Sequence, residues 1–580
     1  MNIKYLSYRK KQNLLLTFFI IVISLVSNFI NAQQYADLVL HNGVVITVDK
    51  NNTIAEAIAI SADTILYVGS NASVKNYINN STKTINLKGQ TILPGFIDSH
   101  AHLIGTGKAK VILNLREAKN WDEVVSIVKK AVANTKPEEW IIGRGWHQEK
   151  WIPQPENNVK GYPYHYKLSE VSPNNPVLLS HASGHAILAN EKAMQIAKIF
   201  PNTQNPDGGE IVKDKNGNPV GVFMEDAESL ISAKYKEYQL NKPQKELKRE
   251  KKKYINIAID ECLSKGITTL HDAGATFDDL KIIREMADSN QLKIRLYEMI
   301  LEDYNSLKDS LKNIRTVASN NRHLTIRAIK LYMDGALGSR GAWLLNPYSD
   351  LPNQSGLNVT PLSEIKKIAK LAVENNFQVC THAIGDRANR TILDIYENTL
   401  KSNQNRRQLR WRVEHAQHLS PDDIPRFNKL GIIAAMQGIH CTSDAPFVEK
   451  RLGKIRAKEG AYVWHSLIEN GTTICNGTDS PVEDIDPIPN IYASVTRKTK
   501  NGTEFYPNQK MTRLEAIKSY TINGAYAAFE ENIKGSLEVG KLADITVLSK
   551  NILTIPTDEI LNTKVMMTIV GGKILFRRNN

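Results

Sequence analysis

The sequence predicts an α/β protein in which a barrel of alternating strands and helices is joined to a small β-sandwich. Two observations predict this fold. Short apolar strands alternate with longer amphipathic segments through the middle of the chain, whereas both chain ends are rich in β-type residues. With 580 residues, 42% of them hydrophobic and 23% charged, the chain has the composition of a globular protein, which excludes disorder and a multi-pass membrane protein.

The N-terminal residues 1–32 have the pattern of a Sec-type signal peptide. Basic residues precede an apolar run from Leu14 to Val26, and Ala32 stands at the expected cleavage point. The run is short for a membrane span, so we expect export to the periplasm or the medium and no stable span after cleavage. An uncleaved N-terminal anchor is the alternative.

Charge and cysteine content exclude two further classes of protein. The net charge is +14, and the signal peptide supplies four of these positive charges, which leaves +10. The densest basic run, residues 248–253, is accompanied by Glu246 and Glu250, as in a solvated helix face, so we expect no nucleic-acid partner. The four cysteines have no C-x-x-C spacing, which predicts isolated buried thiols, with one disulfide as the alternative.

The β-sandwich is expected from residues 33–92 and 535–580. Short β-rich runs separated by turns occur in both segments, at residues 36–49, 57–60, 66–68, 84–87, 543–548 and 567–576. The shared texture predicts that the two chain ends meet in one composite domain.

The barrel is expected from residues 93–534, where strands and helix-like segments alternate. Residues 105–254 are far longer than one β/α unit needs. We interpret them as an insertion over the barrel mouth, where insertions commonly shape substrate pockets.

Candidate metal ligands begin with His100 and His102. Alternation along a strand puts both imidazoles on one face, so they can reach the same ion. A lone His-x-His pair is a weak signal, and two ordinary histidines are the alternative.

Lys330 is a second candidate because it stands inside an apolar strand. A buried ammonium must be paired, deprotonated or modified. A neutral amine can add CO₂ to become a carbamate that bridges two cations. The alternative is an ordinary lysine paired with Asp334 or Asp272.

His382 and His415 each close a short strand, and Asp479 follows the last predicted strand. Active-site groups on barrels gather at the carboxyl ends of strands. Cys380 shares a strand face with His382, one layer deeper, and is expected to pack rather than to bind metal.

Together these motifs make the chain resemble the amidohydrolase superfamily, and within it the amidohydrolase 3 or YtcJ-like family. The resemblance covers nearly the whole mature chain. It rests on the runs LPGFIDSHAH from Leu93, DGALGSR from Asp334, HAIGDRA from His382, EHAQ from Glu414, DSPV from Asp479 and GKLAD from Gly540.

The resemblance implies a distorted (β/α)₈ TIM barrel beside the sandwich, a small-molecule substrate and, as in many members, a homodimer. It also implies one or two divalent ions, often zinc, with Lys330 carboxylated in some members. The implied ligands are the residues that match the family pattern: His100, His102, Lys330, His382, His415 and Asp479. Such a site hydrolyses C–N bonds other than peptide bonds with metal-activated water, and the residue matching Asp479 would move the proton.

Substrate contacts are expected from Trp146, His185 and His440, with a purely structural role as the alternative for the two histidines. The chain departs from the family here, with His147 where Asp is more frequent and Ser183 before Gly184-His185 where Asp is usual. These departures leave the substrate open. A deaminase, a cyclic imide or lactam hydrolase, and a non-catalytic periplasmic binding protein on the same scaffold are the alternatives.

Overall fold

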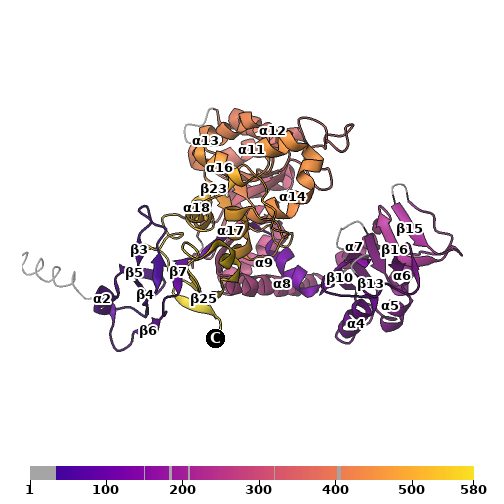
Figure 1. Cartoon of the computed structure of the whole chain (residues 1–580), viewed down its shortest axis with the longest axis horizontal. Coiled ribbons are helices and arrows are strands. Elements are labelled where there is room, and N and C mark those ends of the chain that lie inside the picture. The colour runs from indigo at the N-terminus through magenta and orange to yellow at the C-terminus, as the bar shows by residue number, and fades with distance from the viewer. Residues whose placement is uncertain are drawn as a thin grey trace, which may run out of the picture.

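The computed structural model describes residues 34–148, 151–181, 186–206, 209–318, 321–401 and 406–579. The predicted signal peptide therefore lies outside the described residues. The described chain forms a central barrel, with a β-sandwich on one side and an insertion lobe on the other (Figure 1). None of the helices within these ranges is both long and apolar enough to cross a membrane.

The barrel is built from parallel strands that follow one another in chain order. They are β8 (Phe96–Ala101), β17 (Ile267–Ala275), β18 (Arg295–Ile300), β19 (Leu324–Tyr332), β20 (Gln378–Ala383), β21 (Arg412–His415), β22 (Ile433–Met436) and β23 (Ile474–Asn476). β8 and β23 are the two ends of this eight-stranded sheet. The loop after β23 closes the seam, since Asp479 N donates to His100 O at 2.7 Å and His102 N donates to Ser480 O at 2.8 Å. The distorted TIM barrel is confirmed.

Amphipathic helices cover the outside of the barrel. In α11 (Leu362–Glu374), for example, Ile365, Ile368 and Ala369 are buried, and their spacing places them on one helix face. The other helices are α8 (Gln244–Ser264), α9 (Phe277–Asp288), α10 (Tyr304–Ile314), α12 (Asp386–Leu400), α13 (Ile424–Leu430), α14 (Gly438–Leu452), α15 (Lys454–Gly460), α16 (Trp464–Glu469), α17 (Pro487–Thr496), α18 (Arg513–Ser519) and α19 (Ile522–Ala527). They enclose one large apolar core together with the strands.

Both chain ends contribute to the β-sandwich, as predicted. One sheet contains β1 (Leu38–His41), β4 (Ala57–Ser61), β5 (Thr64–Gly69) and β6 (Lys83–Asn86). The other contains β2 (Val44–Ile46), β3 (Ile54–Ala55) and β7 (Thr91–Pro94) from the N-terminal part, with β24 (Ile545–Leu548), β25 (Val565–Val570) and β26 (Lys573–Arg577) from the C-terminal part. β7 pairs in parallel with β2 and antiparallel with β24, so it joins the two parts.

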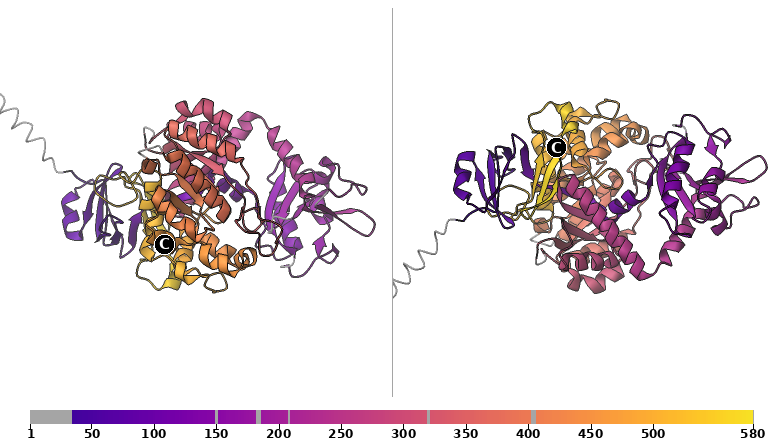
Figure 2. Two further views of the ribbon diagram at one scale, coloured as in Figure 1. Left: turned by 90° about the horizontal axis from the view of Figure 1, so that it is seen from above. Right: turned by 90° about the horizontal axis from the view of Figure 1, so that it is seen from below.

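The sandwich lies at the amino ends of the barrel strands. Thr546 of β24 donates to Gly266 O, next to the start of β17. Arg295 at the start of β18 pairs with Asp544, with Nε 2.7 Å from Oδ2. The carboxyl ends of the strands therefore open away from the sandwich, on the side where the insertion lobe lies (Figures 1 and 2).

The insertion has a sheet and apolar cores of its own. After α3 (Leu103–Val111), it contains β9 (Leu113–Asn114), α4 (Trp121–Val132), β10 (Ile141–Trp146), β11 (Asn158–Val159), β12 (Tyr162–Pro163), α5 (Tyr166–Val171), β13 (Val177–His181), β14 (Ala186–Ala189), α6 (Glu191–Ile196), β15 (Gly209–Lys213), β16 (Pro219–Glu225) and α7 (Glu228–Leu240). All four cysteines of the chain lie elsewhere, in the barrel, where they are buried and form no disulfide.

Candidate metal centre

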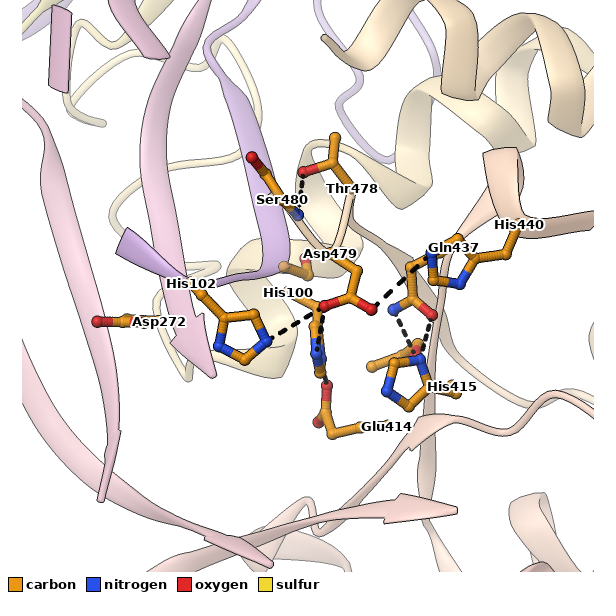
Figure 3. Close-up of polar contacts among 12 residues, drawn as sticks. His100, His102, Asp272, Glu414, His415, Gln437, His440, Thr478, Asp479 and Ser480 are labelled. Carbon is orange, nitrogen blue, oxygen red and sulfur yellow. Dashed lines mark hydrogen bonds and ion pairs between the residues drawn. The ribbon is translucent and has the colours of Figure 1, made fainter. Parts of the chain in front are cut away.

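His100, His102 and Asp479 meet at the seam of the barrel (Figure 3). His100 belongs to β8, His102 precedes α3, and Asp479 belongs to the loop after β23. Asp479 Oδ1 lies 3.2 Å from His102 Nε2 and 3.6 Å from His100 Nε2. Two imidazoles and a carboxylate at these separations are a donor set that suits zinc and similar divalent ions.

The loop that carries Asp479 is held in an unusual backbone conformation. Asp479 has a φ of 56°, in the left-handed region that non-glycine residues rarely adopt. Thr478 fixes the loop by donating from Oγ1 to the buried Asp98 Oδ2 at 2.6 Å. A Cβ on Gly477 would lie 2.5 Å from His100 N, so only glycine permits this close approach of the two strands. Strain of this kind is commonly stored at functional sites.

His382 and His415 line the adjacent wall, at the ends of β20 and β21. Their ring centroids are 4.4 Å apart, and the His415 ring lies 4.9 Å from that of His100. His415 Nδ1 lies 2.7 Å from Gln437 Oε1, an amide oxygen that can only accept, so the hydrogen is on Nδ1 and Nε2 keeps its lone pair. His382 Nε2 lies 3.7 Å from Asp334 Oδ1.

Several imidazole nitrogens in this cluster lack partners, which is the strongest sign that it binds an ion. Within the described part of the chain, Nε2 of His100, His382 and His440 is buried without a hydrogen-bond partner. Buried polar atoms are normally satisfied, so these orphaned nitrogens need an explanation. Those of His100 and His440 lie 3.6 and 3.8 Å from the carboxylate of Asp479. Among the described residues, His100 with His102 and His415 with His440 each place their ligand atoms within 4.8 Å of one another and of Asp479.

Electrostatics favour the neutral form of His100, His382 and His415, which is the form that can bind a metal ion. Burial and the Lys330 charge lower the pKa of His100 to about 4 and that of His382 to about 3. Burial acts to raise the pKa of Asp479, but contacts with His102 and the other imidazoles outweigh it and hold that pKa well below its ordinary value. At neutral pH these three imidazoles are therefore uncharged donors beside the carboxylate of Asp479.

Lys330 extends from β19 into the same region and is only 1% exposed. Its Nζ lies 4.8 Å from the centroid of the Tyr332 ring. Within the described residues, no carboxylate oxygen lies within 4.0 Å of Nζ, so the expected alternative of a pair with Asp334 or Asp272 is not found. Asp334 instead accepts from the backbone N–H groups of Ile384 and Gly385 at 2.9 and 2.8 Å. Burial lowers the pKa of Lys330, which favours the neutral amine.

The three residues expected to contact substrate have different placements. His440, near the start of α14, points into the cluster, with Nε2 3.8 Å from Asp479 Oδ2. Trp146 does not reach it: the indole is buried in the core of the insertion and donates from Nε1 to Leu179 O at 2.8 Å. Trp146 therefore lies outside the cluster, because its ring is enclosed by insertion residues. His185 lies outside the described residues.

Sequence reasoning missed Glu414 and Arg412, which lie directly beneath the imidazoles. Both side chains are fully buried and form an ion pair. The signal was present, since a strand carrying two charged residues at alternate positions puts both on one face, here the barrel interior. Cys380, lower in the barrel, has its Sγ 3.3 Å from Gln378 Oε1, in keeping with a packing role.

Comparison with known proteins gives consistent matches over almost the whole chain. A family model described as the amidohydrolase family matches residues 83–576. Protein LONG AFTER FAR-RED 3 of Arabidopsis thaliana is 35% identical, over 93% of this chain and 92% of its own length. The putative amidohydrolase YtcJ of Bacillus subtilis is 30% identical, over 93% and 99%. An N-substituted formamide deformylase of Arthrobacter pascens is 28% identical, over 94% and 99%.

Solved structures agree with the sequence comparisons. The crystal structure of an uncharacterized metal-dependent hydrolase from Pyrococcus furiosus superimposes with a TM-score of 0.72 and is 27% identical. The match covers 89% of this chain and 100% of that chain.

Proposed function

The chain belongs to the amidohydrolase family and is a hydrolase acting on C–N bonds, and we propose that its substrate is a small amide other than a peptide. The observation that carries this proposal concerns Nε2 of His100 and of His440. Both atoms lack a hydrogen-bond partner among the described residues, and both face the carboxylate of Asp479. The relative named as an N-substituted formamide deformylase favours N-formyl amines within this substrate class.

The residues present fit one or two divalent ions, and we propose zinc. Asp479 with His100 and His102 would hold one ion, and His382 and His415 are available for a second. A bound divalent ion polarises the scissile carbonyl and lowers the pKa of water toward neutrality. Lys330 is close to this wall and burial lowers its pKa, so it is a candidate for carboxylation, which would supply a further anionic ligand.

The protein residues then have separate tasks in hydrolysis. Asp479 is ionised at neutral pH, so Oδ2 is free to take a proton from the attacking water and pass it to the leaving amine. His440 Nε2 lies 3.8 Å from that oxygen, has no hydrogen-bond partner in the described part of the chain, and is in reach of the same reacting groups. We assign it to binding the substrate beside Asp479.

A substrate panel with metal-loaded protein tests the proposal. It should include an N-formyl amine, an N-acetyl amine, a cyclic imide, a lactam, an aminopyrimidine and an ester. We expect turnover of the open-chain amides, abolition by a chelator and recovery on adding zinc. Turnover confined to the cyclic compounds or to the aminopyrimidine would identify an imide hydrolase or a deaminase. A protein that binds such compounds but turns none over would be a binding protein.

We also propose that the chain is exported and assembles as a homodimer. The basic residues before an apolar run support the first point. Cell fractionation with N-terminal sequencing should find the mature chain beginning at residue 33. Light scattering on the purified protein should give twice the chain mass.

A further inference from the structure

A fully buried ion pair lies under the candidate metal centre and is not explained by metal ligation. Arg412 and Glu414 are both on β21 and have side chains with no exposed surface. Arg412 Nη2 donates to Glu414 Oε2 at 2.9 Å, and Nε lies 2.7 Å from Oε1. Charges are costly to bury, and replacing such a pair by apolar side chains often leaves stability unchanged. Its position under the histidines suggests another purpose.

Glu414 also contacts His100 directly. Its Oε2 accepts from His100 Nδ1 (Figure 3). An ionised carboxylate can only accept a hydrogen bond, so this contact places the imidazole hydrogen on Nδ1. The lone pair of neutral His100 is then on Nε2, the atom that lies 3.6 Å from Asp479 and has no hydrogen-bond partner in the described structure.

Arg412 ties this contact to two other strands. Nη2 donates to Ser99 O of β8 at 2.7 Å, one residue before His100. Nη1 lies 3.1 Å from Nδ1 of His271 in β17, and arginine can only donate, so His271 accepts. One guanidinium therefore fixes both the carboxylate that orients His100 and the backbone beside it.

We propose that Glu414 and Arg412 are positioning residues that hold His100 as its Nδ1–H tautomer and thereby set the affinity of the centre for a divalent cation. The proposal rests on the proposed function only in that the cluster must bind a cation. Outer hydrogen-bond partners of metal-bound histidines typically change metal affinity by about 10- to 100-fold. Neither residue needs to touch the substrate.

The chain offers a matched control in the pair of Arg295 and Asp544, at the base of the barrel. Both side chains are 4% exposed, and their atoms lie 2.7 and 2.9 Å apart. Asp544→Asn and Glu414→Gln each remove the negative charge from a buried ion pair. Only Glu414 contacts a histidine of the candidate metal centre. A purely structural role would make the two variants behave alike.

The experiment measures Co²⁺ affinity of the metal-stripped full-length protein by competition with a chromophoric chelator, together with thermal unfolding of the same samples. Glu414→Gln should weaken Co²⁺ binding by about 10- to 100-fold. Asp544→Asn should lower the unfolding temperature but leave Co²⁺ affinity unchanged. Equal affinity in Glu414→Gln and the wild type would overturn the proposal.

Two further measurements cover variants that fail to fold. Glu414→Asp keeps the charge beside Arg412 but withdraws the oxygen from His100, so weakened Co²⁺ binding is again expected. If neither variant folds, ¹⁵N NMR of the wild-type protein identifies the tautomer of His100. An Nδ1–H tautomer would support the proposal, and an Nε2–H tautomer would overturn it. A wild-type protein without affinity for Co²⁺ would instead refute the proposed function, which separates the two failures.

Discussion

Replacing Asp479 by asparagine removes the carboxylate on which the proposed chemistry depends and changes the shape of the side chain very little. Oδ1 would remain as an amide oxygen facing His100 and His102, at 3.6 and 3.2 Å in the wild type. Oδ2, which faces His440, would become an NH₂ group that cannot accept a proton. The variant therefore separates proton transfer from the shape of the site.

The expected loss follows from the role assigned to that oxygen. A positioned general base contributes about 10²- to 10⁴-fold to the rate, which is about 3 to 5 kcal/mol in the activation barrier. Loss of the negative charge also weakens metal binding. Measurements at saturating Zn²⁺, with bound metal quantified in each sample, isolate the effect on kcat.

The assay is steady-state turnover of the best open-chain amide from the panel. We expect kcat of Asp479→Asn to fall at least 100-fold while the protein remains folded and metal-loaded. A fully metal-loaded variant that keeps more than about a tenth of the wild-type kcat would refute the role of Asp479 as general base, because removing a general base lowers kcat by more than that.

Three further predictions follow from contacts around the site and at the barrel base. Trp146→Ala should destabilise the insertion by about 3 to 5 kcal/mol, measured by thermal unfolding, and should leave KM unchanged in steady-state kinetics. A raised KM at unchanged stability would show that Trp146 contacts the substrate. Gly477→Ala should weaken Co²⁺ binding, because its Cβ would lie 2.5 Å from His100 N; unchanged affinity would show that the seam relaxes. Asp544→Asn should cost about 3 to 5 kcal/mol in denaturant unfolding at pH 7, since it leaves Arg295 buried and unpaired. Burial acts to raise the pKa of Asp544, but Arg295 outweighs it and the net shift is downward, so this stabilisation is present above about pH 4 and is lost on further acidification. An acid unfolding profile of the wild type that matches that of the variant would contradict it.

The fold could be predicted from the sequence because the patterns that indicate it are local. Strands alternating with amphipathic segments such as α11 specify a barrel, and β-rich chain ends specify a sandwich, through periodicities that act over a few residues. The order of histidines, lysine and aspartate at strand ends was equally readable, since parallel strands bring their carboxyl ends to one edge. The sequence alone thus determined the fold class, the family and the candidate ligands.

Only the tertiary structure decided which atoms meet. Glu414 contacts His100 across 314 positions of chain, and Arg412 contacts Ser99 across 313. The motif around Trp146 predicted a place near the substrate, yet the indole packs inside the insertion. Burial of its large apolar ring favours that place. Contacts between distant strands depend on register and barrel closure, which no local pattern encodes. The seam that brings Asp479 to His100 therefore depends on how the barrel closes as well as on the local contacts of Gly477 and Thr478.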